Sequence, residues 1–250
     1  MIRRGVVQAS NLAVAFALVI GYTGCTQSPP SRSPIEAAGT AGASTVLTTA
    51  AVDALAERAT VRIEGTSCDA EWVGSGFLVD LDGDRPDPPV VVTNRHVVEG
   101  SSSLRVRPTT AAALTVTGVS QLRFTDLAII SVDGTVPEPL VLASVEPTKG
   151  DHVRVFGYPG GGAFDRKTGT VHDHVREAEL GSTGEIMRLD VWVRPGNSGG
   201  PVIDRHGNVV GVVYAIERST HLGLAIPART LSRMADDPAA NREVADCESS

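Results

Sequence analysis

The sequence predicts an all-β fold of two barrels or sandwiches in tandem, followed by a short helix. Three observations carry this prediction. From Thr60 onward the chain is a series of short apolar runs rich in Val, Ile and Thr, with Gly, Pro, Asp or Asn between them. Helical periodicity is almost absent from these runs. The chain of 250 residues is 42% hydrophobic, which suffices for a sizeable core.

The strand-sized runs fall into two sets. The first set reads TVRIEG, VGSGFLVDLDGDRPDPP, VVVTN, SLRVRP, LTVTGVS and DLAIISVDG. The second reads DHVRVFGYPGG, GTVHDH, IMRLDVWV, PVIDRHGNVVGVVYAI and HLGLAIP, with a hairpin signal at DRHGNVV. The seam lies at Glu146 to Asp151, so the two lobes span about 56–146 and 147–235. Only Pro227 to Pro238 predicts a helix, because Leu231 and Met234 have the spacing of one helix face.

Residues 1–25 predict an export signal. Arg3 and Arg4 precede an uncharged run from Leu12 to Tyr22 that is too short to span a membrane comfortably, and small residues lead to Cys25. Residues 26–55, rich in Ser, Thr, Pro, Ala and Gly, predict a flexible tether. The formal net charge is -7 without any basic run, which excludes nucleic acid as an expected partner. Because an export signal directs a chain across the membrane, we expect this protein to act outside the cytoplasm.

The stretch RPGNSGGPV places Ser198 in a glycine-rich turn. Such a serine is either a turn residue or a nucleophile, and a nucleophile needs a base, a group that orients the base, and N–H donors for the oxyanion. His96 in VVVTNRHVV is the candidate base, because it follows a strand and an Asn that can cap a helical turn. Asp126 in RFTDLAII is the candidate orienter, although its position alone does not distinguish it from neighbouring acidic residues.

The motifs GSGFLV, VVTNRHVV, DLAII and GNSGGPV, in this order, resemble those of trypsin-like serine proteases of the chymotrypsin fold, including the HtrA branch. From Thr60 to Cys247 the chain resembles the actinobacterial periplasmic proteases of the MarP type more closely still, in VRIEGTSCDAEWVGSGFLV, VFGYPGGGAF and GVVYAI. The resemblance implies two six-stranded antiparallel barrels over residues 56–247, a three-residue tail at 248–250, and a location in the periplasm or on the outer face of a bacterial membrane. It implies a serine endopeptidase of the cell envelope that needs no cofactor, with a role in stress or acid resistance.

Carried over to this sequence, the resemblance makes Ser198 the nucleophile, His96 the base and Asp126 its orienter. The N–H groups of Gly196 and Ser198 would form the oxyanion hole. The residues expected to wall the substrate pocket carry no charge, which implies cleavage after small or medium apolar residues; they are Trp192, Val193, Tyr214 and Ala215.

The sequence departs from relatives in ways that bear on regulation and attachment. Asn197 replaces the Asp that pairs with a newly cut N-terminus in digestive proteases, so activation by such a cut is not expected. We expect neither the transmembrane helices of the MarP type nor the PDZ domain of HtrA proteases, because residues 1–25 predict an export signal and only 12 residues follow Pro238. YTGC resembles a bacterial lipobox but has Tyr22 where leucine is usual, so Cys25 is either acylated, which would anchor the protein to the membrane, or an unmodified cysteine near a cleavage site.

Three alternatives remain at this stage. Cys68 and Cys247 are an even pair in an exported chain and, by resemblance, form a disulfide, although two free thiols are the other interpretation. His172 and His174 in HDH lack further ligands, so a solvated loop is preferred over a metal site. The competing function is a catalytically inactive protein of the same fold that binds peptides. No feature of the sequence indicates an oligomeric state.

Overall fold

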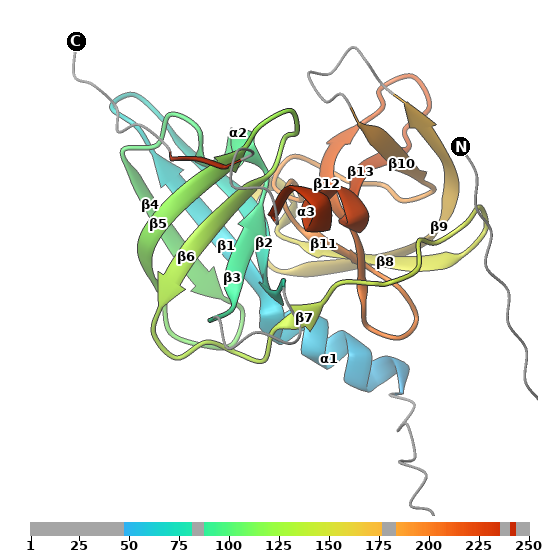
Figure 1. Cartoon of the computed structure of the whole chain (residues 1–250), viewed down its shortest axis with the longest axis horizontal. Helices are drawn as coiled ribbons and strands as arrows, with labels where there is room; N and C mark the ends of the chain where they lie inside the picture. Colours follow the sequence, from blue (N-terminus) through green and yellow to red (C-terminus); the bar gives the residue numbers. More distant parts are fainter. Residues whose placement is uncertain (1–47, 82–87, 177–183, 236–240, 244–250) are drawn as a thin grey trace, which may run out of the picture. The chain divides into compact units, whose positions relative to one another are not determined.

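The computed structural model describes residues 48–81, 88–176, 184–235 and 241–243. Within them the two predicted lobes are present as two β-sheets (Figure 1). The export signal with Cys25, most of the predicted tether, Cys247 and the tail at 248–250 lie outside the described residues. No helix among the described residues is both long enough and apolar enough to cross a membrane.

The first lobe is an eight-stranded sheet in the order β14-β5-β6-β3-β2-β1-β4, with β7 beside β2. Its strands are β1 (Thr60–Thr66), β2 (Glu71–Asp80), β3 (Val90–Thr93), β4 (Ser103–Pro108), β5 (Thr115–Leu122), β6 (Ala128–Asp133), β7 (Leu140–Val141) and β14 (Asn241–Glu243). Instead of the complete ladder of a closed barrel, only an isolated bridge between Val106 and Leu114 joins β4 to the residue before β5. This lobe is therefore a half-barrel of eight strands where the resemblance implied a six-stranded barrel, and the predicted all-β fold class is confirmed.

The second lobe is the predicted six-stranded barrel, and it is closed. Its strands, in the order β10-β13-β12-β11-β8-β9, are β8 (His152–Gly157), β9 (Asp165–Arg176), β10 (Glu185–Leu189), β11 (Pro201–Ile203), β12 (Val209–Ile216) and β13 (Gly223–Pro227). All its neighbouring strands are antiparallel. The helix α3 (Ala228–Ala235) follows β13 and lies within the range predicted for the closing helix.

A helix that the sequence did not predict, α1 (Thr49–Ala59), precedes the first strand. The prediction of a flexible tether is therefore wrong for residues 49–55. The hydroxyl of Thr48 caps the helix by accepting a hydrogen bond from the N–H of Ala51 (3.2 Å). Its buried face includes Val52 and Ala56. The helix also carries Asp53, whose carboxylate pairs with Arg154 of the second lobe (2.6 Å).

The two lobes share one apolar core. Phe77 and Ile130 of the first lobe belong to the same buried cluster as Ile203 and Ile226 of the second lobe. A further cluster, which includes Val155, fills the second barrel. Because the lobes meet through buried side chains, residues contributed by either lobe can be held in fixed positions at their boundary.

The chain crosses back to the first lobe after α3. Strand β14 pairs with β5, with Asn241 opposite Leu122, and this return was not predicted. Cys68 is exposed and has no disulfide partner among the described residues. Since Cys247 lies outside them, the bridge between these two cysteines stays a prediction.

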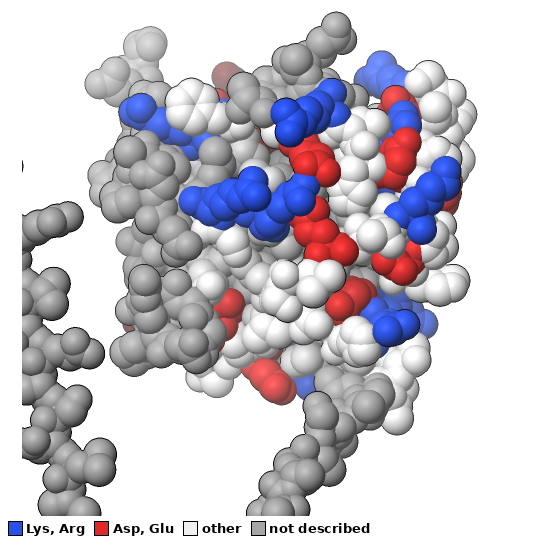
Figure 2. Space-filling view, turned by 45° about the vertical axis from the view of Figure 1, so that its right-hand side comes forward, with Lys and Arg blue, Asp and Glu red and all other residues white. Residues whose placement is uncertain are grey.

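The surface carries charges of both signs close together. Figure 2 shows acidic and basic side chains side by side on the face that it presents. Elsewhere in the structure an ion pair joins β9 to β10, where Arg188 binds both carboxylate oxygens of Asp173 at 2.7 and 2.6 Å. The hydrogen bonds from Arg188 lower the pKa of Asp173, so this carboxylate is held in its charged form.

Candidate active site

The base and its orienter meet at the short helix α2 (Arg95–Val98). Asp126 Oδ2 lies 2.6 Å from His96 Nδ1, and Asp126 Oδ1 accepts a hydrogen bond from the backbone N–H of His96 (3.0 Å). Asn94 occupies the N-cap position of α2, but its side chain does not cap the helix. Its amide instead donates to the backbone carbonyl of Asp126 (2.8 Å), so Asp126 caps the turn and Asn94 holds Asp126.

This arrangement fixes the histidine ring. The side chain of Asp126 is 17% exposed and that of His96 is 45% exposed, so the carboxylate is shielded while the ring stays accessible. With Nδ1–H donated to the carboxylate, the lone pair of His96 Nε2 is left to accept a proton. The structure therefore brings together two of the three residues that the sequence proposed.

Ser198 lies in the loop between β10 and β11, next to the histidine turn. Gly199 has a φ of 84°, and a Cβ there would lie 2.1 Å from the carbonyl oxygen of Ser75 and 3.1 Å from the backbone nitrogen of Asn94. Only glycine therefore fits after Ser198. The loop of the second lobe packs directly on strand β2 and on the residue before α2 of the first lobe.

The loop has two N–H groups that make no hydrogen bond within the described part of the chain, those of Gly196 and Ser198. Their directions are set by the preceding carbonyls, because the C=O and N–H of a trans peptide point opposite ways. The carbonyl of Pro195 accepts the N–H of Gly160 (2.6 Å), and that of Asn197 accepts the N–H of Gly200 (2.9 Å). These two N–H groups are the pair that the sequence proposed as oxyanion donors.

The hydroxyl of Ser198 donates to the carbonyl of Tyr214 at 3.4 Å. Between the described side chains of Ser198 and His96 there is no hydrogen bond. Catalytic hydrogen bonds are often long or misaligned without substrate, so this geometry is compatible with a nucleophile and base that align when a substrate binds. Asn197 is buried, and its Oδ1 accepts the backbone N–H of Arg194 (3.2 Å), which is a local role that needs no partner from a cut terminus.

A pocket of about 200 Å³ opens beside Ser198. Three residues expected in it do line it: Val193, Tyr214 and Ala215. Trp192 does not, because its side chain is 57% exposed and stacks on the ring of His221 with the ring centres 5.6 Å apart. Arg194 lines the pocket and is exposed, so the expectation of a pocket without charge is wrong at this position. The sequence placed Arg194 beside the serine but carried no signal for its direction.

The two histidines of HDH lie in strand β9, so their interpretation as a solvated loop is wrong. His174 Nε2 contacts the carbonyl of Pro147 (2.9 Å), and its Nδ1 lies 3.3 Å from a carboxylate oxygen of Glu185. Glu146, His174 and Glu185 each offer one atom that could bind a metal ion, and these three atoms lie within 4.8 Å of one another. The guanidinium of Arg229 binds both carboxylates, however, and so already supplies positive charge. Burial raises the pKa of Glu146.

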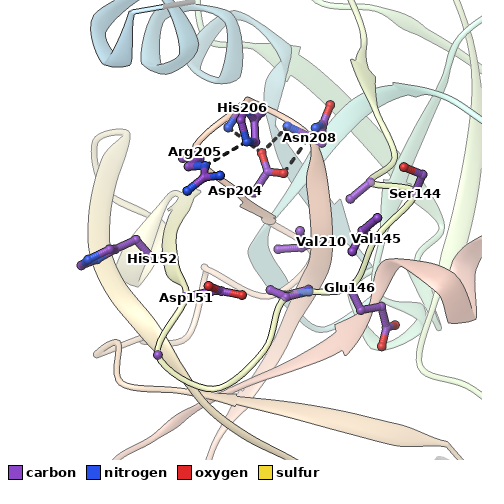
Figure 3. Close-up of a pocket in the computed structure, with 13 residues that line it drawn as sticks. Ser144, Val145, Glu146, Asp151, His152, Asp204, Arg205, His206, Asn208 and Val210 are labelled. Carbon is purple, nitrogen blue, oxygen red and sulfur yellow. Dashed lines mark hydrogen bonds between the residues drawn. The ribbon is translucent and has the colours of Figure 1, made fainter. Parts of the chain in front are cut away.

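A second pocket, of about 450 Å³, contains none of the proposed active-site residues (Figure 3). It lies between the segment that joins the two lobes and the hairpin at 204–208. Asp204 holds the hairpin by accepting the N–H groups of His206 (2.8 Å) and Asn208 (2.9 Å). Its lining carries acidic and basic groups, but it offers no serine with a paired histidine.

Comparison with known proteins agrees with this geometry. Residues 74–212 match the family model described as the trypsin-like peptidase domain. Serine protease Rv3671c of Mycobacterium tuberculosis is 34% identical over 176 residues, which cover 65% of this chain and 41% of that protein. The chloroplastic Protease Do-like 1 of Arabidopsis thaliana is 32% identical over 177 residues, which cover 65% of this chain and 38% of that protein.

Solved structures extend the similarity. The crystal structure of the active form of the Rv3671c protease from M. tuberculosis has a TM-score of 0.69 at 29% identity, covering 89% of this chain and 98% of that one. The HtrA-type protease AlgW with a tripeptide has a TM-score of 0.63 at 24% identity, covering 74% and 61%, which supports a shared fold. The chain spans about two fifths of the length of the sequence relatives it matches.

Proposed function

The chain belongs to the trypsin-like peptidase family, and on that premise we propose that it is a serine endopeptidase that cleaves protein or peptide substrates through an acyl-enzyme. The observation that supports this best is that the N–H groups of Gly196 and Ser198 make no hydrogen bond to any described residue, in a loop that packs beside the turn where His96 contacts a carboxylate. A protein that only binds peptides has no need of this combination.

In the proposed reaction, the hydroxyl of Ser198 attacks the scissile carbonyl while Nε2 of His96 takes its proton. The carbonyl oxygen becomes an oxyanion that accepts hydrogen bonds from Gly196 N–H and Ser198 N–H. His96 then passes the proton to the leaving amine, and the acyl group stays on Ser198. Water then attacks the ester while His96 takes its proton, and His96 returns this proton to Ser198 Oγ as the acid is released. Asp126 stabilises the imidazolium in both halves.

Labelling by a fluorophosphonate probe, measured together with casein hydrolysis, tests the proposal. Phosphonylation requires an activated serine, whereas peptide binding does not. We expect a single label on Ser198 and time-dependent loss of hydrolysis. Wild-type protein that binds peptides but neither takes the label nor hydrolyses casein would instead be the catalytically inactive binding protein of the same fold.

We expect cleavage after small or medium apolar residues. The pocket walls include Val193, Val213 and Ala215, and a charged side chain buried among these three residues, away from Arg194, would cost about 1–3 kcal/mol or more. Arg194 is exposed and is placed at the rim in this proposal. A peptide-library profile measures the preference, and Arg194→Ala should leave it unchanged. A profile dominated by Asp and Glu that Arg194→Ala abolishes would assign Arg194 the selecting role; one dominated by Arg or Lys would also contradict the proposal.

The proposed location is the cell envelope outside the cytoplasm, where the protein would take part in stress or acid resistance. If Cys25 is acylated, the exported protein should partition into the detergent phase and Cys25→Ala should move it to the aqueous phase, because several acyl chains hold a protein firmly at a membrane. Aqueous partitioning of the intact exported protein would show that it is secreted without a lipid anchor.

We also propose that Cys68 and Cys247 form a disulfide. In the chain-entropy model, a bridge that closes the loop between Cys68 and Cys247 destabilises the unfolded state by about 5 kcal/mol, so reduction of the bridge should lower the thermal stability. Because the bridge would tie the C-terminal segment across the molecule, reduction should also lower activity. Mass spectrometry of non-reduced native protein checks the pairing, and two alkylatable thiols in exported material would refute it.

A further inference from the structure

Ser75 of strand β2 joins the first lobe to the loop that carries Ser198. The residue is fully buried at 0% exposure. Its hydroxyl donates to the carbonyl of Gly196 (2.6 Å), and its backbone N–H donates to the carbonyl of Ser198 (2.8 Å). The same hydroxyl accepts the backbone N–H of Tyr158 (3.0 Å). Three hydrogen bonds of one residue thus cross from the first lobe to the second.

These bonds act on the peptides next to the proposed oxyanion donors. The peptide between Gly196 and Asn197 is held at both ends, by the hydroxyl of Ser75 on its carbonyl and by the carbonyl of Arg194 on its N–H (3.0 Å). The carbonyl of Ser198 is held by the N–H of Ser75. Since glycine rotates freely about φ and ψ, Gly196 would have other orientations open to it without this contact.

The hydroxyl also reaches the second segment that orients the donors. Tyr158 directly precedes the 3₁₀ turn η1 (Pro159–Gly161), and Gly160 in that turn holds the carbonyl of Pro195 and so sets the direction of the Gly196 N–H. By accepting from Tyr158 and donating to Gly196, one hydroxyl fixes the turn relative to the loop.

A serine is required here for both chemical and steric reasons. Of the small side chains, a hydroxyl both donates and accepts, whereas alanine does neither. The space is tight, because a Cβ on Gly157 would lie 2.7 Å from Ser75 Oγ and 3.2 Å from the amide nitrogen of Asn197. Loss of the hydroxyl would leave a buried carbonyl and a buried N–H without their partner.

We propose that Ser75 is a positioning residue that holds the oxyanion-binding N–H groups of Gly196 and Ser198 from the opposite lobe, an inference that rests on the proposed peptidase function. The lobe that carries His96 and Asp126 thereby also controls the geometry of the oxyanion hole. Docking of the two lobes thereby brings the base to the loop of Ser198 and also aligns the N–H donors of that loop.

The same turn offers a matched control. Thr109 of the first lobe also bonds to Tyr158, through its Oγ1 and the phenol oxygen at 2.8 Å, but it makes no hydrogen bond to the loop at 194–200. Thr109→Val therefore removes a hydrogen bond between the lobes without touching the carbonyl of Gly196. Both variants are expected to lose some thermal stability, and only Ser75→Ala should lose transition-state stabilisation.

The experiment compares wild type, Ser75→Ala and Thr109→Val by kcat, KM and the affinity of a peptide boronic acid, whose tetrahedral adduct resembles the transition state. Because removal of one oxyanion donor costs about 100- to 1000-fold in kcat, misalignment by Ser75→Ala should cost about 10- to 100-fold with KM within about threefold. Boronate affinity should fall by the same factor as kcat/KM. Thr109→Val should keep kcat within about twofold of wild type.

Several outcomes would overturn the inference. They are a Ser75→Ala protein with wild-type kcat, a kcat loss matched by Thr109→Val, or a kcat loss with unchanged boronate affinity. If Ser75→Ala does not fold, Ser75→Cys, which keeps a weak donor, is measured instead and should show the same pattern with a smaller loss. A wild type without hydrolysis would refute the proposed function and this inference with it. If the wild type is active and Ser198→Ala is inactive, the proposed function stands, and the Ser75 variants alone then test this inference.

Discussion

Replacing Ser198 with alanine should reduce peptide hydrolysis by about four to six orders of magnitude, because loss of the nucleophile disables the whole catalytic unit. The fold should persist, since among the described residues the hydroxyl makes one hydrogen bond, a long one of 3.4 Å to the carbonyl of Tyr214. We therefore expect a change in unfolding free energy below about 1 kcal/mol. Casein hydrolysis, fluorophosphonate labelling and thermal denaturation measure the three expectations.

Ser101→Ala is the matched control for this change. Ser101 follows α2 and its hydroxyl donates a shorter hydrogen bond, 2.6 Å, to the carbonyl of Val98. The variant loses at least as much hydrogen bonding as Ser198→Ala but should keep wild-type activity and labelling. Hydrolysis by Ser198→Ala at the level of Ser101→Ala would rule out Ser198 as the nucleophile.

Asp126→Asn should cost about three to four orders of magnitude in kcat while leaving the fold intact. The Asn Oδ1 can still accept the backbone N–H of His96, but its NH₂ group would face the ring where a carboxylate oxygen now lies 2.6 Å from Nδ1. An NH₂ group requires Nδ1 to accept, which puts the ring proton on Nε2 and removes the base. Active-site titration followed by kcat measurement on the titrated fraction gives the result.

A second histidine and aspartate pair serves as the control. His172 Nδ1 lies 3.2 Å from a carboxylate oxygen of Asp190, on the second lobe. Asp190→Asn removes the same chemical contact at a site without a nucleophile, so kcat should be unchanged. Equal losses in Asp126→Asn and Asp190→Asn would indicate a general effect on stability and would contradict a specific role for Asp126.

The sequence alone was sufficient for the all-β fold class, whereas the six-stranded form of the second barrel was expected from the family resemblance. This fold class depends on local patterns, namely apolar runs of strand length with turn residues between them. Each predicted run between His152 and Pro227 contains all or part of at least one strand. Gly199, which follows Ser198, is also a turn residue that the sequence makes visible. Its left-handed backbone conformation favours glycine, and a Cβ there would collide with the backbone of the first lobe. His96 and Asp126 were also chosen correctly as a contacting pair, although for Asp126 the choice depended on the family resemblance.

The tertiary structure decided features whose partners are distant in the chain. The helix α1 has an Ala-rich composition that resembles a tether, and it is stabilised by burying Val52 and Ala56 and by pairing Asp53 with Arg154. β14 exists as a strand through pairing with β5. Trp192 and Arg194 are close in the sequence, yet one points away from the pocket and the other lines it.

Ser75 illustrates why some features can be predicted from the sequence while others are decided by the tertiary structure. In the sequence it is a small residue in a strand, and nothing in GSGF indicates that its hydroxyl will meet a carbonyl 121 residues later and an N–H 83 residues later. Periodicity and turn chemistry report which face of an element is buried, because they act over a few neighbouring residues. Which polar groups a buried side chain must satisfy depends on the elements packed against it, and only the folded arrangement of the two lobes determines that.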